Sequence, residues 1–258
     1  RFSELFLRTR FYQKIPMIRP ETYLPPLELR RYIVEYGVIQ TGIKDKEPFF
    51  YPPTGLSGFL FQTSKNKSEF NVRIQGHEIK VQEPVAIGQV TMPVSGEIVG
   101  EVKLLLVFFH PLGMYQLFGV KMAPLTIFAI PLSTMFKEAR YNTLIDQFYS
   151  NQRTQDQINA INSYFLPLIP QEYFPVKLER VLDFVHEQKG NVTIPDLEQI
   201  GFYHRKTLER HFRKMVGLAP KEYARIYQFK SLIHLIQSRK NMTWSQLAVE
   251  AGYYDLSH

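Results

Sequence analysis

The chain has 258 residues, no cysteine and a net charge of +7 at pH 7, and 45% of its residues are hydrophobic. A chain of this length and composition can bury a sizeable core and is long enough for two domains. The absence of cysteine excludes disulfides, thiolate nucleophiles and cysteine-ligated zinc, and the basic charge favours an anionic partner.

Hydropathy gives no sign of a membrane segment. The longest apolar run, Leu104 to Phe109, is far shorter than the ~20 residues that span a bilayer. No basic and then apolar signal opens the chain. We therefore expect a cytoplasmic protein with no membrane partner. Because the first residue is Arg1 rather than Met, we also expect that a segment precedes it.

Residues 1 to about 130 contain most of the 17 Pro and 14 Gly, placed between short β-branched or aromatic runs. This pattern is typical of strands and tight turns. We expect a turn at 23–26 and either a short helix or a strand at 27–36. Further strands are expected at 33–40, 57–63, 70–75, 77–82, 85–92, 96–100 and 102–109. Their even spacing predicts an antiparallel β-sandwich or small barrel.

Two groups of residues in this region have a structural and a functional interpretation. The aromatic residues either line a ligand pocket or form core, and core is the commoner role of an aromatic-rich strand; they are Phe49, Phe50, Tyr51, Phe59 and Phe61. His77 and His110 could form a cupin-like metal site with Glu78 and Glu83, but they lack the tight spacing of such sites. We therefore expect no metal and no cofactor.

The next elements are helical. A strand ending near Phe109 leads into a short helical turn at 115–118, and 140–165 reads as two helices separated by the polar segment 150–156. This helix pair could pack on the β-rich part, mediate homodimer contacts or serve as a structural bridge. Prolines at 167, 170 and 175 then indicate a linker, and 176–189 predicts an amphipathic helix.

The segment from Thr193 to Gly217 reads as two short helices joined by a tight turn. At 100° per residue, one face of the second helix carries Lys206, Glu209, Arg210 and Arg213, and the opposite face carries Leu208, Phe212 and Met215. Such a helix is either an ordinary surface helix with a solvated charged face or a rod suited to the major groove of DNA. From residue 176 onward, thirteen Lys and Arg oppose nine Asp and Glu, a net +4 of the total +7.

An internal repeat favours the DNA interpretation. Residues 193–207 align with 243–258 when one extra residue is allowed before the second glycine, so that Gly201 matches Gly252. Each copy has a Thr that can cap a helix, a Leu four residues later, a turn glycine and an aromatic pair. Two copies of one supersecondary unit imply two DNA-contacting units.

These motifs resemble the DNA-binding domain of the AraC/XylS family of bacterial transcription regulators. The matching residues are Leu208 to Arg210 with Phe212, Gly217 to Tyr223 with Arg225, and Leu247-Ala248 with Gly252 to Asp255, Ser257 and His258. A weaker resemblance, to a β-rich N-terminal domain in one branch of the family, rests on the segment after Phe108 and on Pro131-Leu132-Ser133. The absence of cysteine excludes the alkyl-accepting repair proteins that carry the same type of DNA-binding domain.

The resemblance implies an α+β protein. A β-rich sensor or dimerisation domain with flanking helices would occupy 1–170. An all-α domain at 176–258 would contain two helix-turn-helix subdomains joined by a linker helix. Four positions depart from the family pattern: Glu198 replaces a small residue, Phe202 occupies the usual glycine position, His204 replaces a Ser N-cap and Gln228 replaces an Arg. The chain ends at His258, where the second recognition helix would begin, so we expect this unit to be incomplete.

The family geometry assigns the DNA contacts. Lys206 and Arg210 would donate to guanine O6 and N7, and Glu209 would accept from cytosine N4. Arg205 and Thr207 would contact phosphate or base at the mouth of the groove, Arg213 and Lys214 backbone phosphate, and Ser257 and His258 the groove of the second unit. Asp255 would cap the second recognition helix.

Three functions remain open at this stage. The first is a transcription regulator that binds double-stranded DNA and responds to a small-molecule effector or to homodimerisation, with RNA polymerase as a plausible partner. The second is a regulator whose β-rich domain is a ligand-free interaction module. The third is a cupin-type enzyme with a DNA-binding appendage, and the lack of a Ser-His-Asp, glycine-loop or paired-carboxylate pattern counts against it.

Overall fold

The computed structural model describes residues 20–42, 47–63, 69–74, 77–81, 83–99, 101–126, 129–171, 176–238 and 243–253. The strands are β1 (Glu21–Tyr23), β2 (Ile33–Gly42), β3 (Glu47–Tyr51), β4 (Ser57–Gln62), β5 (Glu69–Ile74), β6 (His77–Lys80), β7 (Val85–Ile87), β8 (Val94–Val99), β9 (Glu101–Phe109) and β10 (Ile130–Pro131). The α-helices are α2 (Gly113–Phe118), α3 (Leu132–Met135), α4 (Glu138–Tyr149), α5 (Thr154–Phe165), α6 (Val176–Glu187), α7 (Ile194–Gly201), α8 (Arg205–Met215), α9 (Pro220–Ser238) and α10 (Trp244–Glu250). Three short 3₁₀ helices are η1 (Leu27–Leu29), η2 (Ala123–Thr126) and η3 (Leu166–Leu168).

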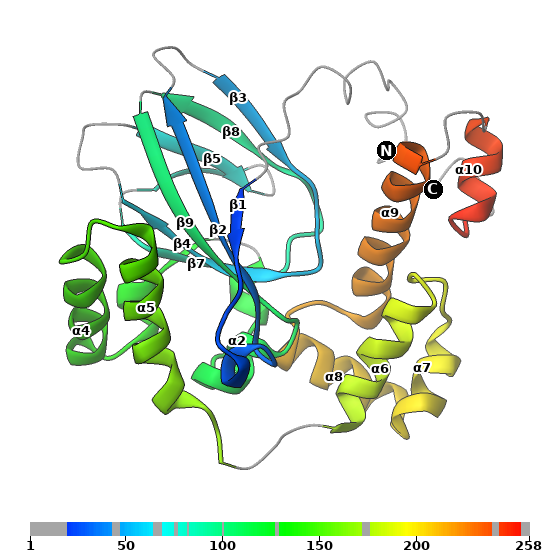
Figure 1. Ribbon diagram of the computed structural model, residues 1–258. Helices are drawn as coiled ribbons and strands as arrows, with labels where there is room; N and C mark the ends of the chain where they lie inside the picture. Colours follow the sequence, from blue (N-terminus) through cyan, green and yellow to red (C-terminus); the bar gives the residue numbers. More distant parts are fainter. Residues whose placement is uncertain are drawn as a thin grey trace.

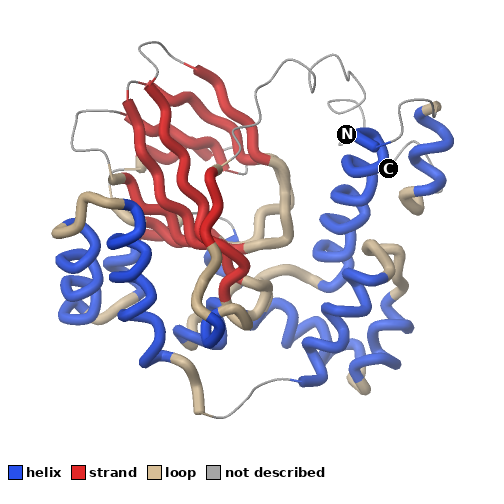
Figure 2. The backbone as a smooth tube through the Cα atoms, in the orientation of Figure 1, coloured by secondary structure: helices blue, strands red, loops and turns tan. Residues whose placement is uncertain are grey.

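The strands all belong to the N-terminal part of the chain, and the C-terminal part is helical (Figures 1 and 2). This confirms the predicted α+β class. The strands form a six-stranded sheet in the order β1-β2-β9-β4-β7-β10 and a four-stranded sheet in the order β3-β8-β5-β6, and every pair is antiparallel. Of the two predicted alternatives, the sandwich is therefore the observed one.

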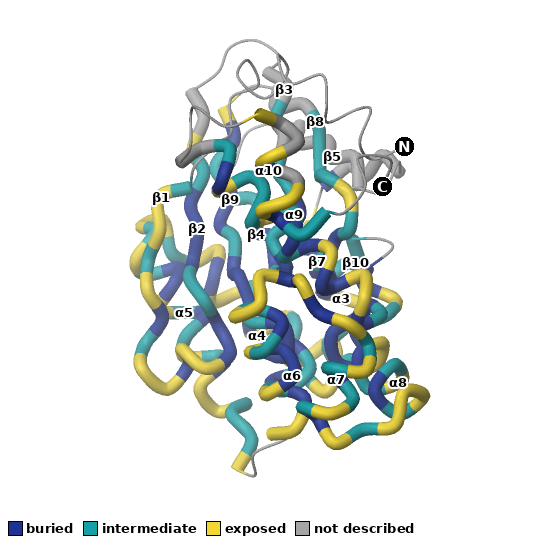
Figure 3. The backbone as a smooth tube through the Cα atoms, turned by 90° about the vertical axis from the view of Figure 1, so that its right-hand side faces the viewer, coloured by how far each residue is buried: buried dark blue, intermediate teal, exposed yellow. Residues whose placement is uncertain are grey.

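Because side chains alternate along its strands, the six-stranded sheet packs on both of its faces, against the four-stranded sheet on one side and against helices on the other. On one face of the six-stranded sheet, Leu60, Leu104 and Leu106 belong to an apolar cluster that also includes Phe49 of β3. On the other face, Leu105 and its neighbours join the cores of α2, α4 and α5. Because successive side chains of a strand point to opposite faces, one sheet can serve both layers. Buried residues, dark blue in Figure 3, accordingly predominate in the central strands β9 and β4.

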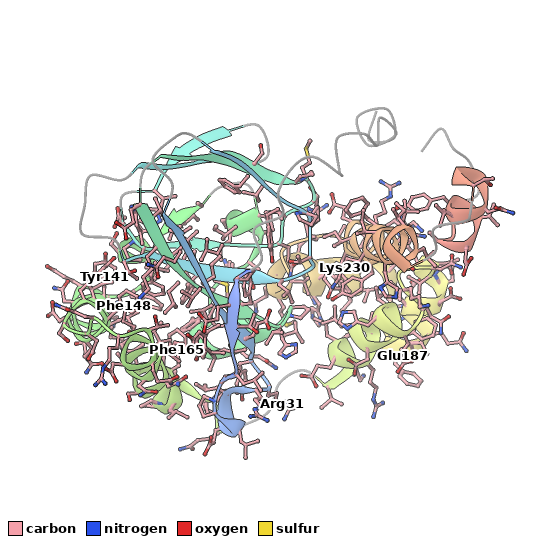
Figure 4. All side chains as sticks on the ribbon, turned by 45° about the horizontal axis from the view of Figure 1, so that its top comes forward. Arg31, Tyr141, Phe148, Phe165, Glu187 and Lys230 are labelled. Atoms are coloured by element: carbon pink, nitrogen blue, oxygen red, sulfur yellow. The ribbon has the colours of Figure 1, made fainter. Side chains whose placement is uncertain are left out.

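Aromatic side chains fill the space between this sheet and the helix pair α4–α5. Phe148 of α4 stacks on Phe61 with ring centroids 4.6 Å apart, and Phe165 of α5 lies 6.1 Å from Phe59 (Figure 4). Phe59 and Phe61 are buried, so the prediction that they form core is confirmed. The predicted helix pair is also confirmed: it packs on the sheet through one apolar face of each helix.

Several sequence expectations for the strands were wrong in detail. Strands β1, β3 and β10 were not predicted, and β7 ends at Ile87 rather than Met92. The segment 27–36 contains both expected alternatives, because η1 is followed by the start of β2. Gln75 and Gly76, between β5 and β6, lie outside the described residues, and these two strands pair antiparallel with Ile74 opposite His77.

The helical part has a main core and a smaller one. Helices α6 to α9 share a buried cluster that includes Leu178, Leu197, Phe212 and Tyr223. Helix α10 packs on the distal end of the long helix α9, where Leu232, Leu235 and Ile236 of α9 form an apolar cluster with Leu247, Ala251 and Tyr253. The predicted linker helix is therefore present, and it carries one helix-turn-helix unit at its start and the first helix of another at its end (Figure 1).

The two parts of the chain touch along several elements. Leu112, just before α2, is buried in the cluster of α6 to α9. The Lys230 ammonium on α9 donates to the Thr54 carbonyl oxygen at 2.9 Å (Figure 4), and Gly55 lies against the Tyr227 ring, which a Cβ at Gly55 would approach to 2.7 Å. The Met122 amide donates to the Lys214 carbonyl oxygen at 3.0 Å. The last turn of α8 is thus held by the β-rich part.

Candidate nucleic-acid interface

Helix α7 begins at a capping box. The Thr193 hydroxyl accepts from the Asp196 amide at 3.3 Å, and the Asp196 carboxylate accepts from the Thr193 amide at 2.8 Å. These two hydrogen bonds satisfy backbone donors that the first turn of a helix leaves free. The Thr193 hydroxyl also donates to the Asp196 Oδ2 at 2.7 Å, and this bond, together with the one from the Thr193 amide, holds the pKa of Asp196 below its usual value. The predicted capping role of Thr193 is confirmed.

The turn between α7 and α8 is built by two neighbouring residues with different tasks. Gly201 is the last helical residue and is buried; a Cβ there would lie 2.6 Å from the Val181 Cγ2 of α6. Phe202 follows with φ 50° and ψ 46°, the left-handed conformation. The amides of Phe202 and Tyr203 donate back to the carbonyls of Gln199 and Glu198, which closes the helix end. Gly201 therefore allows close helix packing, and Phe202 makes the turn.

This geometry corrects the alignment of the repeat. In the second unit, Thr243 and Gln246 form the same type of capping box, and Gly252 has φ 81°. The left-handed residue comes nine positions after the capping Thr in both units, so Phe202 matches Gly252 without an insertion. The prediction that paired Gly201 with Gly252 was wrong, because a glycine chosen for close packing was read as the turn glycine.

Helix α8 has two distinct faces. Leu208, Phe212 and Met215 are buried, whereas Lys206, Arg210 and Arg213 are exposed. The predicted division of the helix is confirmed. Its N-cap His204 makes no side-chain capping hydrogen bond, so the apolar face and the amides donating to His204 at the start of the helix fix its position.

The charged residues of this face differ in whether they have an ion-pair partner. The Arg205 Nε donates to the Glu209 Oε1 at 3.1 Å, an exposed i,i+4 pair worth about 0.3 kcal/mol. Arg210 and Arg213 have no ion pair with any described residue. Burial lowers the pKa of the neighbouring His211, and the charges of Arg210 and Lys214 lower it further. Arg210 is thus a cation available to an incoming anion.

The remaining predicted contacts lie at the edges of this face. Thr207 is half-buried in the first turn of α8. The exposed Lys214 lies at the other end, where its ammonium is 5.5 Å from the centre of the Tyr115 ring of α2. Its contact with the β-rich part was not predicted, because nothing in the local pattern of α8 encodes it. Ser257 and His258 lie outside the described residues, as does Asp255.

The described residues offer no site for a metal ion. They contain no cluster of three or more histidines and carboxylates close enough to hold one. Burial lowers the pKa of His110, and the backbone of Arg30 and the charge of Asp183 oppose this shift. No helix within the described ranges is long and apolar enough to cross a membrane.

Comparisons with known proteins give two findings. Residues 21–131, which are less than half of the chain, match a family described as a domain of unknown function, DUF6597. No curated protein matches the sequence.

Among solved structures, the chain is similar to ToxT from Vibrio cholerae. The first such match has 11% sequence identity and a TM-score of 0.42, and the alignment covers 86% of this chain and 90% of that chain. A structure of ToxT with an unsaturated fatty acid bound has 10% identity and a TM-score of 0.45, with 86% and 88% covered. A third, bound to (E)-4-(8-methylnaphthalen-1-yl)but-3-enoic acid, has 10% identity and a TM-score of 0.43, with 86% and 90% covered.

Proposed function

We propose that this protein is a transcription regulator that binds double-stranded DNA in a sequence-specific way. The observation that carries the proposal is the placement of α8. Its apolar face is buried against α6, α7 and α9, and its exposed face carries three cations, Lys206, Arg210 and Arg213. A helix held in this way by a preceding helix and a tight turn is suited to the major groove, which admits one α-helix.

The repetition of the unit distinguishes this proposal from an ordinary solvated helix. Helix α10 starts with a capping box of the same type as α7 and ends in a left-handed residue at the same distance from its capping Thr. A charged surface helix requires neither a second copy nor a rigid connection to it. Two units joined by the 19-residue helix α9 would address neighbouring segments of one duplex.

Each residue of the proposed interface has a role that suits its surroundings. Arg210 and Lys206 donate to the O6 and N7 atoms of guanine, and Glu209 accepts from cytosine N4 after it releases Arg205. Arg205 and Thr207 contact base or phosphate at the start of the helix. Backbone phosphates are contacted by Arg213 and Lys214, and the groove of the second unit is contacted by Ser257 and His258.

The β-rich part would supply control. Its contacts with the last turn of α8 give a bound effector, or contact with a second copy, a physical route to the reading helix. This favours a sensor or dimerisation domain over an interaction module that is independent of DNA binding. We place the protein in the cytoplasm on the same proposal, with RNA polymerase as a further partner.

The test is DNA binding by the full chain. Duplexes selected from a random pool are compared with scrambled duplexes across a salt series, because the non-specific part of binding falls steeply with salt. Arg210→Ala should weaken binding to the selected sequence by ~5- to 100-fold, the equivalent of one base contact, and should reduce the preference over scrambled DNA. Arg153→Ala is the matched control, since it removes the same charge from an exposed site at the start of α5.

Two results would contradict the proposal. One is the failure of selection to enrich any sequence while binding retains a steep salt dependence, which would mean that the charge attracts DNA and the helix does not read it. The other is an equal effect of Arg210→Ala and Arg153→Ala on binding to the selected duplex. That result would mean that Arg210 contributes only to the overall positive charge of the protein and contacts no base.

A further inference from the structure

A cavity of about 230 Å³ lies in the β-rich part. It is bordered by α2, the end of α3, the first turn of α4 and the end of α5 with η3. Five of its lining side chains are apolar: Leu117, Phe118, Met135, Phe136 and Leu168. The other three are Lys137, Arg140 and Tyr164. The lining thus combines an apolar surface with two cations and a hydroxyl group, all of which can donate hydrogen bonds.

The apolar surface of the cavity includes aromatic rings that lie at steep angles to one another. The rings of Phe118 and Phe136 meet edge to face with centroids 5.4 Å apart, and Phe136 meets Tyr164 in the same way at 6.2 Å. Rings at steep angles to one another offer both faces and edges to an additional ring, which is the arrangement that aromatic groups prefer. This surface therefore suits a compact planar group better than a long flexible chain.

The polar groups gather at the start of α4. Lys137 is the N-cap of this 12-residue helix and forms no side-chain capping hydrogen bond, so the first turn retains free amide donors and the positive end of the helix dipole. Lys137 and Arg140 are exposed, and neither has an ion pair with a described residue. The carboxylate of Glu138, in the same turn, does not line the cavity. The local field therefore favours an anion.

The Tyr164 hydroxyl is a third donor. Its oxygen is buried and has no hydrogen-bond partner among the described residues, which is unfavourable unless a ligand or water supplies one. Burial raises the pKa of this hydroxyl, and the charge of Arg140 opposes the shift. Tyr164 therefore remains a neutral donor at physiological pH, beside two cations.

We propose that this cavity binds a small organic monocarboxylate whose apolar part is a single ring. The carboxylate would accept from Lys137, Arg140 and the Tyr164 hydroxyl, and the ring would pack on Phe118 and Phe136. The volume supports a small ligand, because sites for drug-sized molecules occupy ~300–1,000 Å³. This binding does not depend on the proposed regulation of transcription, since it is measured without DNA.

The test is isothermal titration calorimetry of the full chain with phenylacetate and with phenylacetamide. These probes have nearly the same shape, and only the first carries a charge. Phenylacetate should bind with a stoichiometry of one, and phenylacetamide should bind at least ~10-fold more weakly, because hydrogen bonds to a charged group are the stronger ones. Hexanoate, which replaces the ring by a chain, should also bind more weakly than phenylacetate.

Three variants locate the site. Arg140→Gln should weaken phenylacetate binding by ~10-fold or more, and Tyr164→Phe, which keeps the ring and removes only the hydroxyl, should weaken it by a smaller factor. Arg153→Gln removes a cation from the same domain, where it pairs with Asp156 outside the cavity, and should leave binding unchanged. Circular dichroism of each variant establishes that the fold is retained.

Any of three results would overturn the proposal. The first is no saturable binding of phenylacetate at millimolar concentrations. The second is equal binding of the acid and the amide, and the third is a loss of affinity in Arg153→Gln as large as in Arg140→Gln. Should Arg140→Gln fail to fold, Tyr164→Phe and the comparison of acid with amide still decide the question.

Discussion

The left-handed conformation of Phe202 makes a prediction about stability that can be worked from the structure. Phe202 has φ 50° and ψ 46°, and its side chain is 74% exposed, so little packing offsets the backbone strain. A left-handed conformation costs a residue with a Cβ about 1–2 kcal/mol. Glycine avoids this cost but loses about 0.4–1 kcal/mol more backbone entropy on folding. Phe202→Gly should therefore be more stable than Phe202→Ala by about 1 kcal/mol.

The comparison of glycine with alanine removes the ring from both proteins, so that only the backbone differs. Arg210, exposed in the middle of α8, gives the matched control: there Gly should be less stable than Ala by about 1 kcal/mol, because the position is helical. Urea unfolding followed by far-ultraviolet circular dichroism measures both pairs. If the Gly variant at position 202 were the less stable one, as at position 210, the left-handed turn would be refuted.

Three further changes test other parts of the structure. Thr193→Ala removes the capping box of α7 and should lower the free energy of unfolding by about 1 kcal/mol, measured in urea. Burial lowers the pKa of His186 to about 4, with smaller contributions from the charges of Lys230 and His110. The unfolded chain therefore binds the extra proton first, and stability should be fully present above about pH 6.5 and should fall between about pH 6.5 and 4. His186→Gln should reduce that slope in urea titrations over this pH range. Phe165→Ala opens a cavity among four aromatic neighbours and should cost about 3–5 kcal/mol, measured as a lower urea midpoint.

The elements that sequence reasoning found are those whose pattern repeats over several turns. Helix α8 and the pair α4–α5 follow the periodicity of a helix, since each buries one continuous face. The long strands β2 and β9 are apolar over several residues and contribute to the core on both faces of the sheet. The strands that it missed, β1, β3 and β10, all lie at the edge of a sheet. An edge strand can be short and can contain proline, as at Pro48 and Pro131, because one side of it has no hydrogen-bonding partner.

The charged face of the candidate interface was predictable for the same reason, and there is also a physical reason for the features that could not be predicted. The charged face of α8 follows from periodicity, but the pairing of Arg205 with Glu209 rather than of Glu209 with another cation required coordinates. Gly201 and Phe202 show the difference between composition and geometry. A glycine can provide either close packing or a left-handed turn. The repeat alone paired Gly201 with Gly252, whereas the family pattern placed Phe202 at the glycine position, where the left-handed residue is found.

The contact between α8 and the β-rich part bears on how the proposed DNA contacts of α8 could be controlled. The last carbonyls of a helix have no partner within it, and here the Lys214 carbonyl accepts from the Met122 amide of the other part of the chain. Gly217, with φ 99°, lets the chain approach η2 and the residue before it, since a Cβ there would lie 2.6 Å from the Thr126 Cγ2 and 3.1 Å from the Met122 carbonyl oxygen. Movement of η2 away from α8 would leave that carbonyl unpaired and uncover Gly217. A shift of η2 would therefore act on the end of α8 directly, without passing through α9.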